Sequence, residues 1–256
     1  MPIRVNQGLV VMQPNLLILG GTAEASALAQ IIAKTQIKAR LSYAGRVDRP
    51  RLQPLEMRVG GFGGVAGLAA YLREEKITHL VDATHPFAAQ MSRNALMACT
   101  QTDVKLLALT RPAWTQRDGD NWTTVPNLDA AVMHLDQPAR RVMLAIGRQH
   151  LALFYAQPHH TYLLRLVDPP ETKLAFDHHI LEISRGPFTV AADTALMKTH
   201  QINLIVAKNS GGNGAYPKIE AARNLGLPVI MIDRPVLPQR AETDRPELVM
   251  DWLVQP

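Results

Sequence analysis

The chain has 256 residues, of which 47% are hydrophobic and 19% are charged, which is typical of a folded globular protein and excludes a disordered one. The formal net charge is +5, but aromatic residues make up only 5% and the longest basic cluster is Arg140-Arg141. We therefore do not expect nucleic-acid binding, which needs a basic stripe.

The single cysteine, Cys99, excludes an internal disulfide and a cysteine-based metal centre. No apolar run reaches the roughly 20 residues that span a bilayer. We expect a cytoplasmic protein that does not bind a membrane and holds no metal. Its positive charge favours acidic ligands such as phosphates or polycarboxylates.

Short apolar strands alternate with amphipathic helices along the first part of the chain. After residues 1–14, which we expect to form a loose extension, a buried strand ends at Gly20-Gly21. This alternation is typical of a parallel sheet in an α/β fold. The expected strands are 16–19, 38–44, 79–83 and 105–109, and the expected helices are 23–34, 65–72 and 86–95.

A polar, proline-rich stretch from Pro112 to Pro138 separates this series from a second one. The second series has expected strands at 142–146, 162–167, 179–183, 204–207 and 229–232, and expected helices at 149–155, 189–199, 217–225 and 247–253. We therefore predict two α/β domains with parallel sheets, residues 1–113 and 114–256. A cleft between two such domains is a common place for a ligand.

The first strand runs into Gly20-Gly21-Thr22 and then directly into a helix. Such a turn can bring a pyrophosphate close to the backbone and to the unpaired N–H groups of the helix N-terminus. It is not a complete G-x-G-x-x-G, and Glu24 adds a negative charge that hardly helps an anion. The alternative is an ordinary strand-to-helix turn in which Thr22 caps the helix and Glu24 favours its dipole.

The second strand is followed by Arg46, with no acidic residue at the strand end itself. In dinucleotide-binding folds an arginine near this position accommodates the 2′-phosphate of NADPH, whereas an acidic residue binds the ribose of NADH. Arg46 therefore favours NADPH, although it can also be a solvated turn residue. The glycine-rich run that contains Gly61 and Gly63 either closes over the cofactor or forms a tight turn.

Three polar residues, Asp82, Thr84 and His85, lie on one turn between a strand and a helix. A histidine there can donate a proton near neutral pH, which a reductase needs. In the alternative, Thr84 caps the following helix and Asp82 orients the loop.

Two loops of the second series also follow strands directly. One begins with Arg148, and the other runs Lys208-Asn209-Ser210-Gly211-Gly212. The second loop combines a cation with amide and hydroxyl donors, which suits anionic oxygens, but it lacks the Gly-Lys-Ser/Thr of a Walker A loop. We interpret the histidine pairs 159–160 and 178–179 as surface or core residues rather than metal ligands.

Together these motifs resemble those of one family, the precorrin-6A and cobalt-precorrin-6A reductases of cobalamin biosynthesis. The resemblance covers about residues 16 to 235, and its most specific strings are Asp82-Ala83-Thr84-His85-Pro86-Phe87 and Lys208-Asn209-Ser210-Gly211-Gly212. The other matching segments are Leu19 to Glu24, Tyr43 to Arg46, Gly60 to Gly64, Gly147 to Gln149 and Lys218 to Arg223. The resemblance implies an NADPH-dependent reduction of one double bond in a corrin precursor, and two Rossmann-like domains with the cofactor on the first.

On this hypothesis each loop has a role. The cofactor would contact Gly20, Gly21, Thr22, Arg46, Gly61, Gly63 and Thr84, and the carboxylates of the macrocycle would contact Arg148, Lys208, Asn209, Ser210 and Gly211. Asp82 and His85 are the candidate catalytic residues, with His85 or a water as proton donor. Other pathway enzymes are conceivable partners.

Two alternative functions remain open from the sequence. The chain could reduce another polycarboxylate with NADPH, or it could be a non-catalytic NADP-binding regulator. Whether the macrocycle carries cobalt is also left open.

Overall fold

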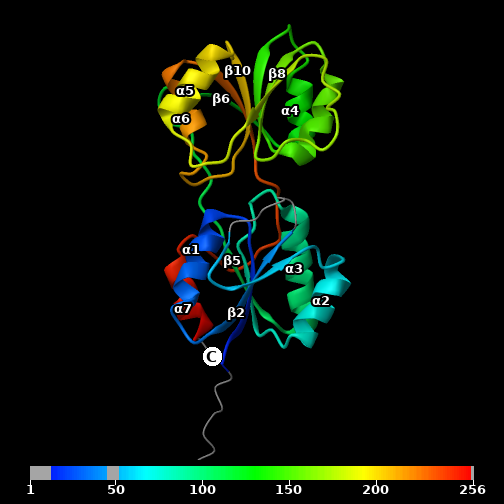
Figure 1. Cartoon of the computed structure of the whole chain (residues 1–256), viewed down its shortest axis with the longest axis vertical. Coiled ribbons are helices and arrows are strands. Elements are labelled where there is room, and N and C mark those ends of the chain that lie inside the picture. Colours follow the sequence, from blue (N-terminus) through cyan, green and yellow to red (C-terminus); the bar gives the residue numbers. More distant parts are fainter. Residues whose placement is uncertain (1–12, 45–51, 255–256) are drawn as a thin grey trace, which may run out of the picture.

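The computed structural model describes residues 13–44 and 52–254 of the chain. It contains two six-stranded sheets, each with helices on both faces, stacked along the long axis of the molecule (Figure 1). All strand pairs in both sheets are parallel. The predicted α/β class with two parallel sheets is therefore confirmed.

The first sheet has the strand order β12-β5-β4-β1-β2-β3. Its strands are β1 (Asn15–Leu19), β2 (Lys38–Tyr43), β3 (Glu56–Val59), β4 (His79–Asp82), β5 (Lys105–Leu109) and β12 (Glu242–Thr243). Side chains of the buried strands point alternately to the two faces of the sheet, so the sheet has one core on each face. The helices α1 (Ala23–Ile32) and α7 (Pro246–Leu253) cover one face, and α2 (Gly64–Glu74) and α3 (Ala89–Thr102) cover the other (Figure 1).

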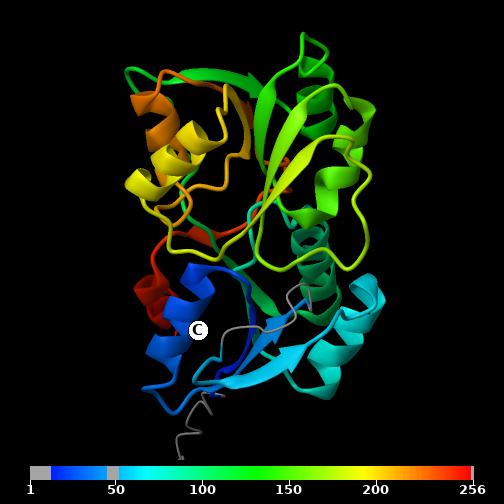
Figure 2. The same ribbon diagram turned by 45° about the horizontal axis from the view of Figure 1, so that its top comes forward.

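The second sheet has the strand order β6-β11-β10-β7-β8-β9. Its strands are β6 (Asn121–Val125), β7 (Arg141–Ala145), β8 (Thr161–Leu166), β9 (His179–Ile183), β10 (Leu204–Lys208) and β11 (Pro228–Ile232). The α-helices α5 (Val190–Thr199) and α6 (Pro217–Asn224) pack on one face. The helix α4 (Leu128–His134) and the 3₁₀ helix η1 (Arg148–Ala156) pack on the other (Figure 2).

Strands β3, β6 and β12 were not expected from the sequence, and each lies toward an edge of its sheet. They are short or partly exposed, so their apolar residues do not form the buried runs that predict central strands. The predicted helix at 149–155 is present in position but has 3₁₀ geometry.

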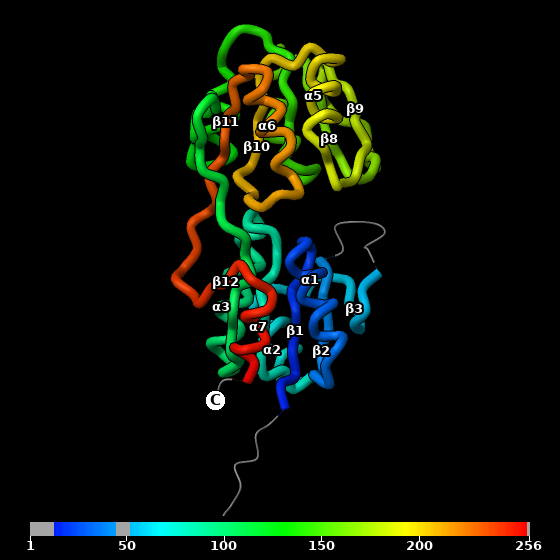
Figure 3. The backbone as a smooth tube through the Cα atoms, turned by 90° about the vertical axis from the view of Figure 1, so that its left-hand side faces the viewer, coloured from blue at the N-terminus to red at the C-terminus, as the bar shows by residue number. Residues whose placement is uncertain are grey.

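The chain crosses between the two sheets twice, through residues 110–120 (the first linker) and residues 233–241 (the second linker) (Figure 3). The second crossing returns the chain to the first sheet, where β12 pairs with β5 and α7 packs against α1. The division into domains at residues 113/114 stays a prediction, but the C-terminal segment joins the sheet of the N-terminal half.

None of the helices in the described ranges is long and apolar enough to cross a membrane. Within these ranges no group of three or more His, Cys, Asp or Glu residues could hold a metal ion.

Candidate functional site

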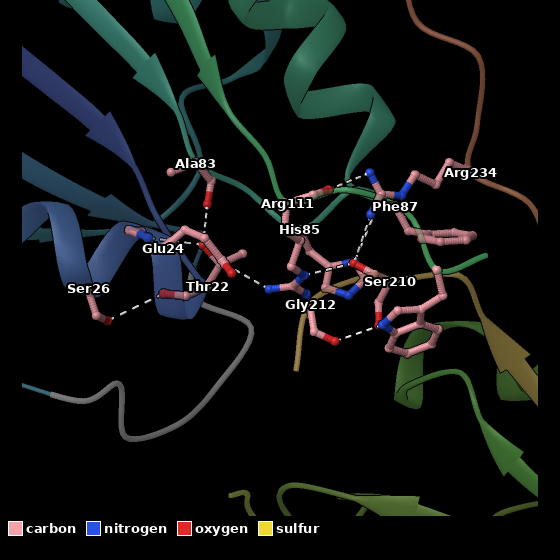
Figure 4. Close-up of polar contacts among 12 residues, drawn as sticks. Thr22, Glu24, Ser26, Ala83, His85, Phe87, Arg111, Ser210, Gly212 and Arg234 are labelled. Carbon is pink, nitrogen blue, oxygen red and sulfur yellow. Dashed lines mark hydrogen bonds and ion pairs between the residues drawn. The ribbon is translucent and has the colours of Figure 1, made fainter. Parts of the chain in front are cut away.

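The loops at the carboxyl ends of the two sheets meet at the junction between them (Figure 4). Residues of α1 and of the β4–α3 loop come from the first sheet, and Ser210 and Gly212 come from the loop after β10 in the second. Ligands of open parallel sheets bind outside the carboxyl ends of the strands. The junction is therefore the candidate site.

The Gly20-Gly21-Thr22 turn has the geometry of a tight strand-to-helix connection. Gly21 has a positive φ of 123°, and nothing lies within 4 Å of where its Cβ would be. The Thr22 hydroxyl accepts a hydrogen bond from the Ala25 N–H at 3.2 Å and donates one to the Ala83 carbonyl at 2.8 Å. Thr22 is thus the helix cap. The groups left to bind an anion are backbone N–H groups of the first helical turn.

The glycine-rich loop after β3 is held in place by an arginine. Arg58 donates to the carbonyl oxygens of Gly60 and Gly61 at 2.5 and 2.7 Å, and its guanidinium lies 4.0 Å from the centroid of the Phe62 ring. Gly63 has a φ of 80°, in the left-handed region. Residue Arg46 lies outside the described residues, so its predicted contact with a 2′-phosphate stays a prediction.

Asp82 is buried at the end of β4 and has several partners. Its carboxylate accepts hydrogen bonds from the N–H and hydroxyl of Thr84, at 3.1 and 2.7 Å, and from the Ser92 hydroxyl at 2.6 Å. It also forms a buried ion pair with Arg240 of the second linker at 2.7 Å. These contacts match the part of the alternative in which Asp82 orients the loop, and they leave the carboxylate only 1% exposed. Thr84 does not cap the following helix, because α3 begins after Ala88, which has no side-chain cap.

His85 lies on the same loop, and its Nδ1 accepts a hydrogen bond from the Phe87 N–H at 3.2 Å. Burial lowers its pKa to about 3, assisted by the nearby charges of Arg111, Lys208, Arg234 and Lys218. His85 is therefore neutral at pH 7, with its proton on Nε2. It can donate a hydrogen bond from Nε2 but lacks the extra proton of an imidazolium acid.

The loop after β10 packs closely against the first linker. Both amide atoms of Asn209 bind the backbone of Trp114, at 2.7 and 2.9 Å, and the Trp114 indole N–H donates to the Gly212 carbonyl at 2.7 Å. Gly211 has a φ of 69°, and a Cβ on it would lie 2.1 Å from the Pro112 carbonyl oxygen. The glycine is thus required by close packing as well as by the turn.

Lys208 and Arg148 occupy different surroundings. The Lys208 ammonium lies 5.2 Å from the centroid of the Phe87 ring, so this residue of the second sheet reaches the β4–α3 loop of the first. Arg148 is exposed at the start of η1, and its guanidinium forms an ion pair with Glu171 at 3.3 Å. Substrate binding by Arg148, Lys208, Asn209, Ser210 and Gly211 stays a prediction.

Two arginines at the junction were not predicted as site residues. Arg111 donates from Nε to the Ser210 carbonyl at 2.8 Å and pairs with the Glu24 carboxylate at 2.8 Å. Arg234 donates to the carbonyl oxygens of Asn209, Ser210 and Arg111 at 3.0, 3.1 and 2.9 Å (Figure 4). Each stands two residues after a strand and precedes a proline, a repeated signal that could have indicated both.

A cavity of about 510 Å³ opens at this junction beside the second linker. Its lining includes Pro86 and Thr110 from the first half of the chain, and Arg234 and Arg240 from the second linker. The cavity therefore adjoins the loop that carries His85.

Comparisons with known proteins agree with one another. The sequence model of the family described as "Precorrin-6x reductase CbiJ/CobK" matches residues 15–254. The chain is 57% identical to a precorrin-6A reductase of Rhodobacter capsulatus, over 93% of this chain and 95% of that protein. It is 30% identical to a cobalt-precorrin-6A reductase of Priestia megaterium, over 86% of this chain and 90% of that protein. A solved structure titled "CobK precorrin-6A reductase" superposes with a TM-score of 0.91 at 56% identity, covering 94% of this chain and 96% of that one.

Proposed function

The chain belongs to the precorrin-6x reductase CbiJ/CobK family, and from this premise we propose that it reduces one double bond of the metal-free precorrin-6A macrocycle with NADPH. The observation that carries the proposal is the similarity to precorrin-6A reductases over nearly the whole chain, at 57% and 48% identity for two of them. The confirmed family also makes a nucleic-acid module or a non-catalytic regulator the weaker alternative.

The identities favour the metal-free substrate. The chain is 57% identical to the precorrin-6A reductase of Rhodobacter capsulatus, but 30% and 28% identical to two cobalt-precorrin-6A reductases. The higher identity to a precorrin-6A reductase therefore favours precorrin-6A as the substrate. Precorrin-6A bears many carboxylates, which suits a chain with a net charge of +5.

The first sheet offers groups that fit a dinucleotide. The turn at Gly20 and Gly21 lies at the N-terminus of a helix of 10 residues, and the space at Gly21 is open. The Glu24 carboxylate, which would repel a phosphate, is paired with Arg111. We therefore assign the pyrophosphate to the first turn of α1 and the 2′-phosphate to Arg46, with Gly61, Gly63 and Thr84 beside the bound cofactor. NADPH would supply the hydride.

The second sheet supplies the groups for the macrocycle. Lys208 and Ser210 lie at the junction, and Arg148 is exposed at the start of η1, which follows β7. Carboxylates held by these residues would orient the macrocycle so that its reducible bond faces the first sheet. Positioning of this kind can account for much of the rate enhancement of a hydride transfer.

The reduction adds a hydride to one atom of the double bond and a proton to the other. We assign that proton to His85 in its doubly protonated form, or to a water that His85 holds. The imidazole is neutral at pH 7 because burial, and then four nearby cations, lower its pKa. Carboxylates that neutralise Arg111 and Lys208 would raise its pKa, so substrate binding itself favours the protonated form.

The test is anaerobic mixing of the protein with NADPH and precorrin-6A while the NADPH absorbance is followed. We expect loss of one NADPH per macrocycle, with a change in the macrocycle spectrum. Turnover of cobalt-precorrin-6A alone would contradict the metal-free assignment. Binding of NADPH without oxidation in the presence of either substrate would contradict the reductase proposal and favour a regulator.

A further inference from the structure

Glu24 occupies a position that is unfavourable for an anion-binding turn. It is the second residue of α1, where a carboxylate stabilises the helix dipole but repels a phosphate at the same helix end. The first-turn N–H groups therefore attract an anion, whereas the Glu24 charge repels it. The contacts of this side chain resolve the conflict.

The Glu24 carboxylate is directed to Arg111 of the first linker. The two side chains are 19% and 17% exposed and form an ion pair of 2.8 Å, so the pair is largely shielded from solvent. The same guanidinium donates from Nε to the Ser210 carbonyl, also at 2.8 Å. Glu24, Arg111 and Ser210, which we call the clasp, thus connect the helix end of the first sheet with the loop after β10 of the second.

Arg111 has little freedom to move away from this position. Its carbonyl oxygen accepts a hydrogen bond from Arg234 at 2.9 Å, and Arg234 also donates to the Ser210 carbonyl at 3.1 Å. On its other side, Gly212 leaves room for the Arg111 side chain, because a Cβ there would lie 2.4 Å from Arg111 Cδ. The guanidinium therefore stays between the two loops, and what can change is how strongly Glu24 neutralises it.

We infer that the clasp couples the two binding loops, so that an anion at the N-terminus of α1 increases the affinity of the loop after β10 for carboxylates. This inference rests on the proposed function, which places the cofactor at the first loop and the macrocycle at the second. Glu24 and Arg111 are positioning residues in this account.

The positive sign of the coupling requires that the Glu24 carboxylate move away from Arg111 when a phosphate binds at the helix end. A phosphate at the helix end repels the Glu24 carboxylate and weakens its hold on Arg111. The positive charge of Arg111 then acts more strongly on carboxylates beside Ser210. Two polyanions bound side by side would otherwise repel each other and weaken each other's binding, so positive coupling distinguishes the clasp from simple proximity.

The coupling is measured with NADP⁺ and precorrin-6A, which are both oxidised and cannot exchange a hydride. The dissociation constant of NADP⁺ is determined by calorimetry with and without saturating precorrin-6A. For the unmodified protein we expect NADP⁺ to bind at least about fivefold more tightly when precorrin-6A is present, the lower end of typical coupling factors.

Glu24→Gln removes the carboxylate charge with little change in shape. We expect this variant to bind NADP⁺ alone more tightly, because a repulsive charge is gone, and to lose the coupling. A merely structural role for Glu24 would instead weaken binding of NADP⁺ alone. Arg111→Lys keeps the positive charge but loses the guanidinium that contacts both Glu24 and Ser210. We expect this variant to reduce the coupling as well.

Glu56→Gln is the matched control, since Glu56 forms an ion pair of the same length, 2.8 Å, with Arg40 away from the junction. It should leave the coupling unchanged, and thermal unfolding checks that each variant is folded. Absence of coupling in the unmodified protein, or full coupling in Glu24→Gln, would overturn the inference. Failure of the unmodified protein to bind NADP⁺ at all would overturn the proposed function instead.

Discussion

His85 shows how burial and neighbouring charge together decide what a residue can do. A lone histidine on a strand-to-helix turn suggests an acid, but burial and the cations around it hold its pKa at about 3. Its nearest backbone contact, from the Phe87 N–H to Nδ1, leaves the proton on Nε2. The residue type thus indicated the site, while its protonation state depends on burial and on cations from four other segments of the chain.

This pKa predicts a dependence of stability on pH. Because the pKa of His85 is lower in the folded protein than the usual 6.5, the unfolded chain binds one more proton between about pH 3 and 6.5. Stability therefore falls as the pH falls through this window, by up to about 1.4 kcal/mol per pH unit from this residue. In His85→Gln the free energy of unfolding, measured in urea between pH 4 and 6, should decrease less steeply. Equal slopes in the two proteins would contradict the assignment.

At the scale of the elements, the linkers and the loop after β10 form one packed unit. Asn209 binds the backbone of Trp114, and the two linker arginines share the Ser210 carbonyl. Gly211 and Gly212 of this loop, which resemble part of an anion-binding cradle in the sequence, have linker atoms within 2.4 Å of where a Cβ would be. The same residues are therefore needed for the joint between the sheets, whatever they contribute to substrate binding.

Two glycine substitutions separate the cost of backbone strain from the cost of close packing against the first linker. Gly211 and Gly226 have similar φ values of 69° and 64°, but only Gly211 would bring a Cβ to 2.1 Å from the Pro112 oxygen, whereas Gly226 faces open space. We expect Gly226→Ala to cost about 1 kcal/mol of stability through backbone strain, and Gly211→Ala to cost at least about 2 kcal/mol more. Urea unfolding of both variants measures the difference. Similar losses would show that the linker moves aside at little cost.

At the scale of the whole molecule, the return of the chain to the first sheet brings β1 and α7 into one core. Strand β12 contributes only two residues, yet β5 pairs with it, and Arg240 just before it forms the buried ion pair with Asp82. Val249 and Leu253 of α7 pack with residues of β1 and α1. The C-terminal helix therefore completes the half of the molecule that we propose to bind the cofactor.

Leu253→Ala tests this arrangement. Its side chain is 2% exposed within the core of the first sheet, so its truncation should cost about 2–5 kcal/mol of unfolding free energy. The adjacent Val254 is 74% exposed, and Val254→Ala should change stability by less than about 0.5 kcal/mol. Addition of NADPH should raise the midpoint of the Leu253→Ala transition if the first sheet binds the cofactor. Equal effects of the two substitutions would place α7 outside the core.

Local patterns in the sequence predict the two parallel sheets, most of their central strands and the strand-end loops at Gly20, Asp82 and Lys208. These features follow from local patterns, since apolar runs mark buried strands and glycines mark the turns after them. The ion pairs that join the site come from the three-dimensional arrangement alone. Examples are Glu24 with Arg111 and Asp82 with Arg240, which lie 87 and 158 residues apart in the chain. Such pairs depend on strand order and on where each linker crosses, and no local periodicity carries that information.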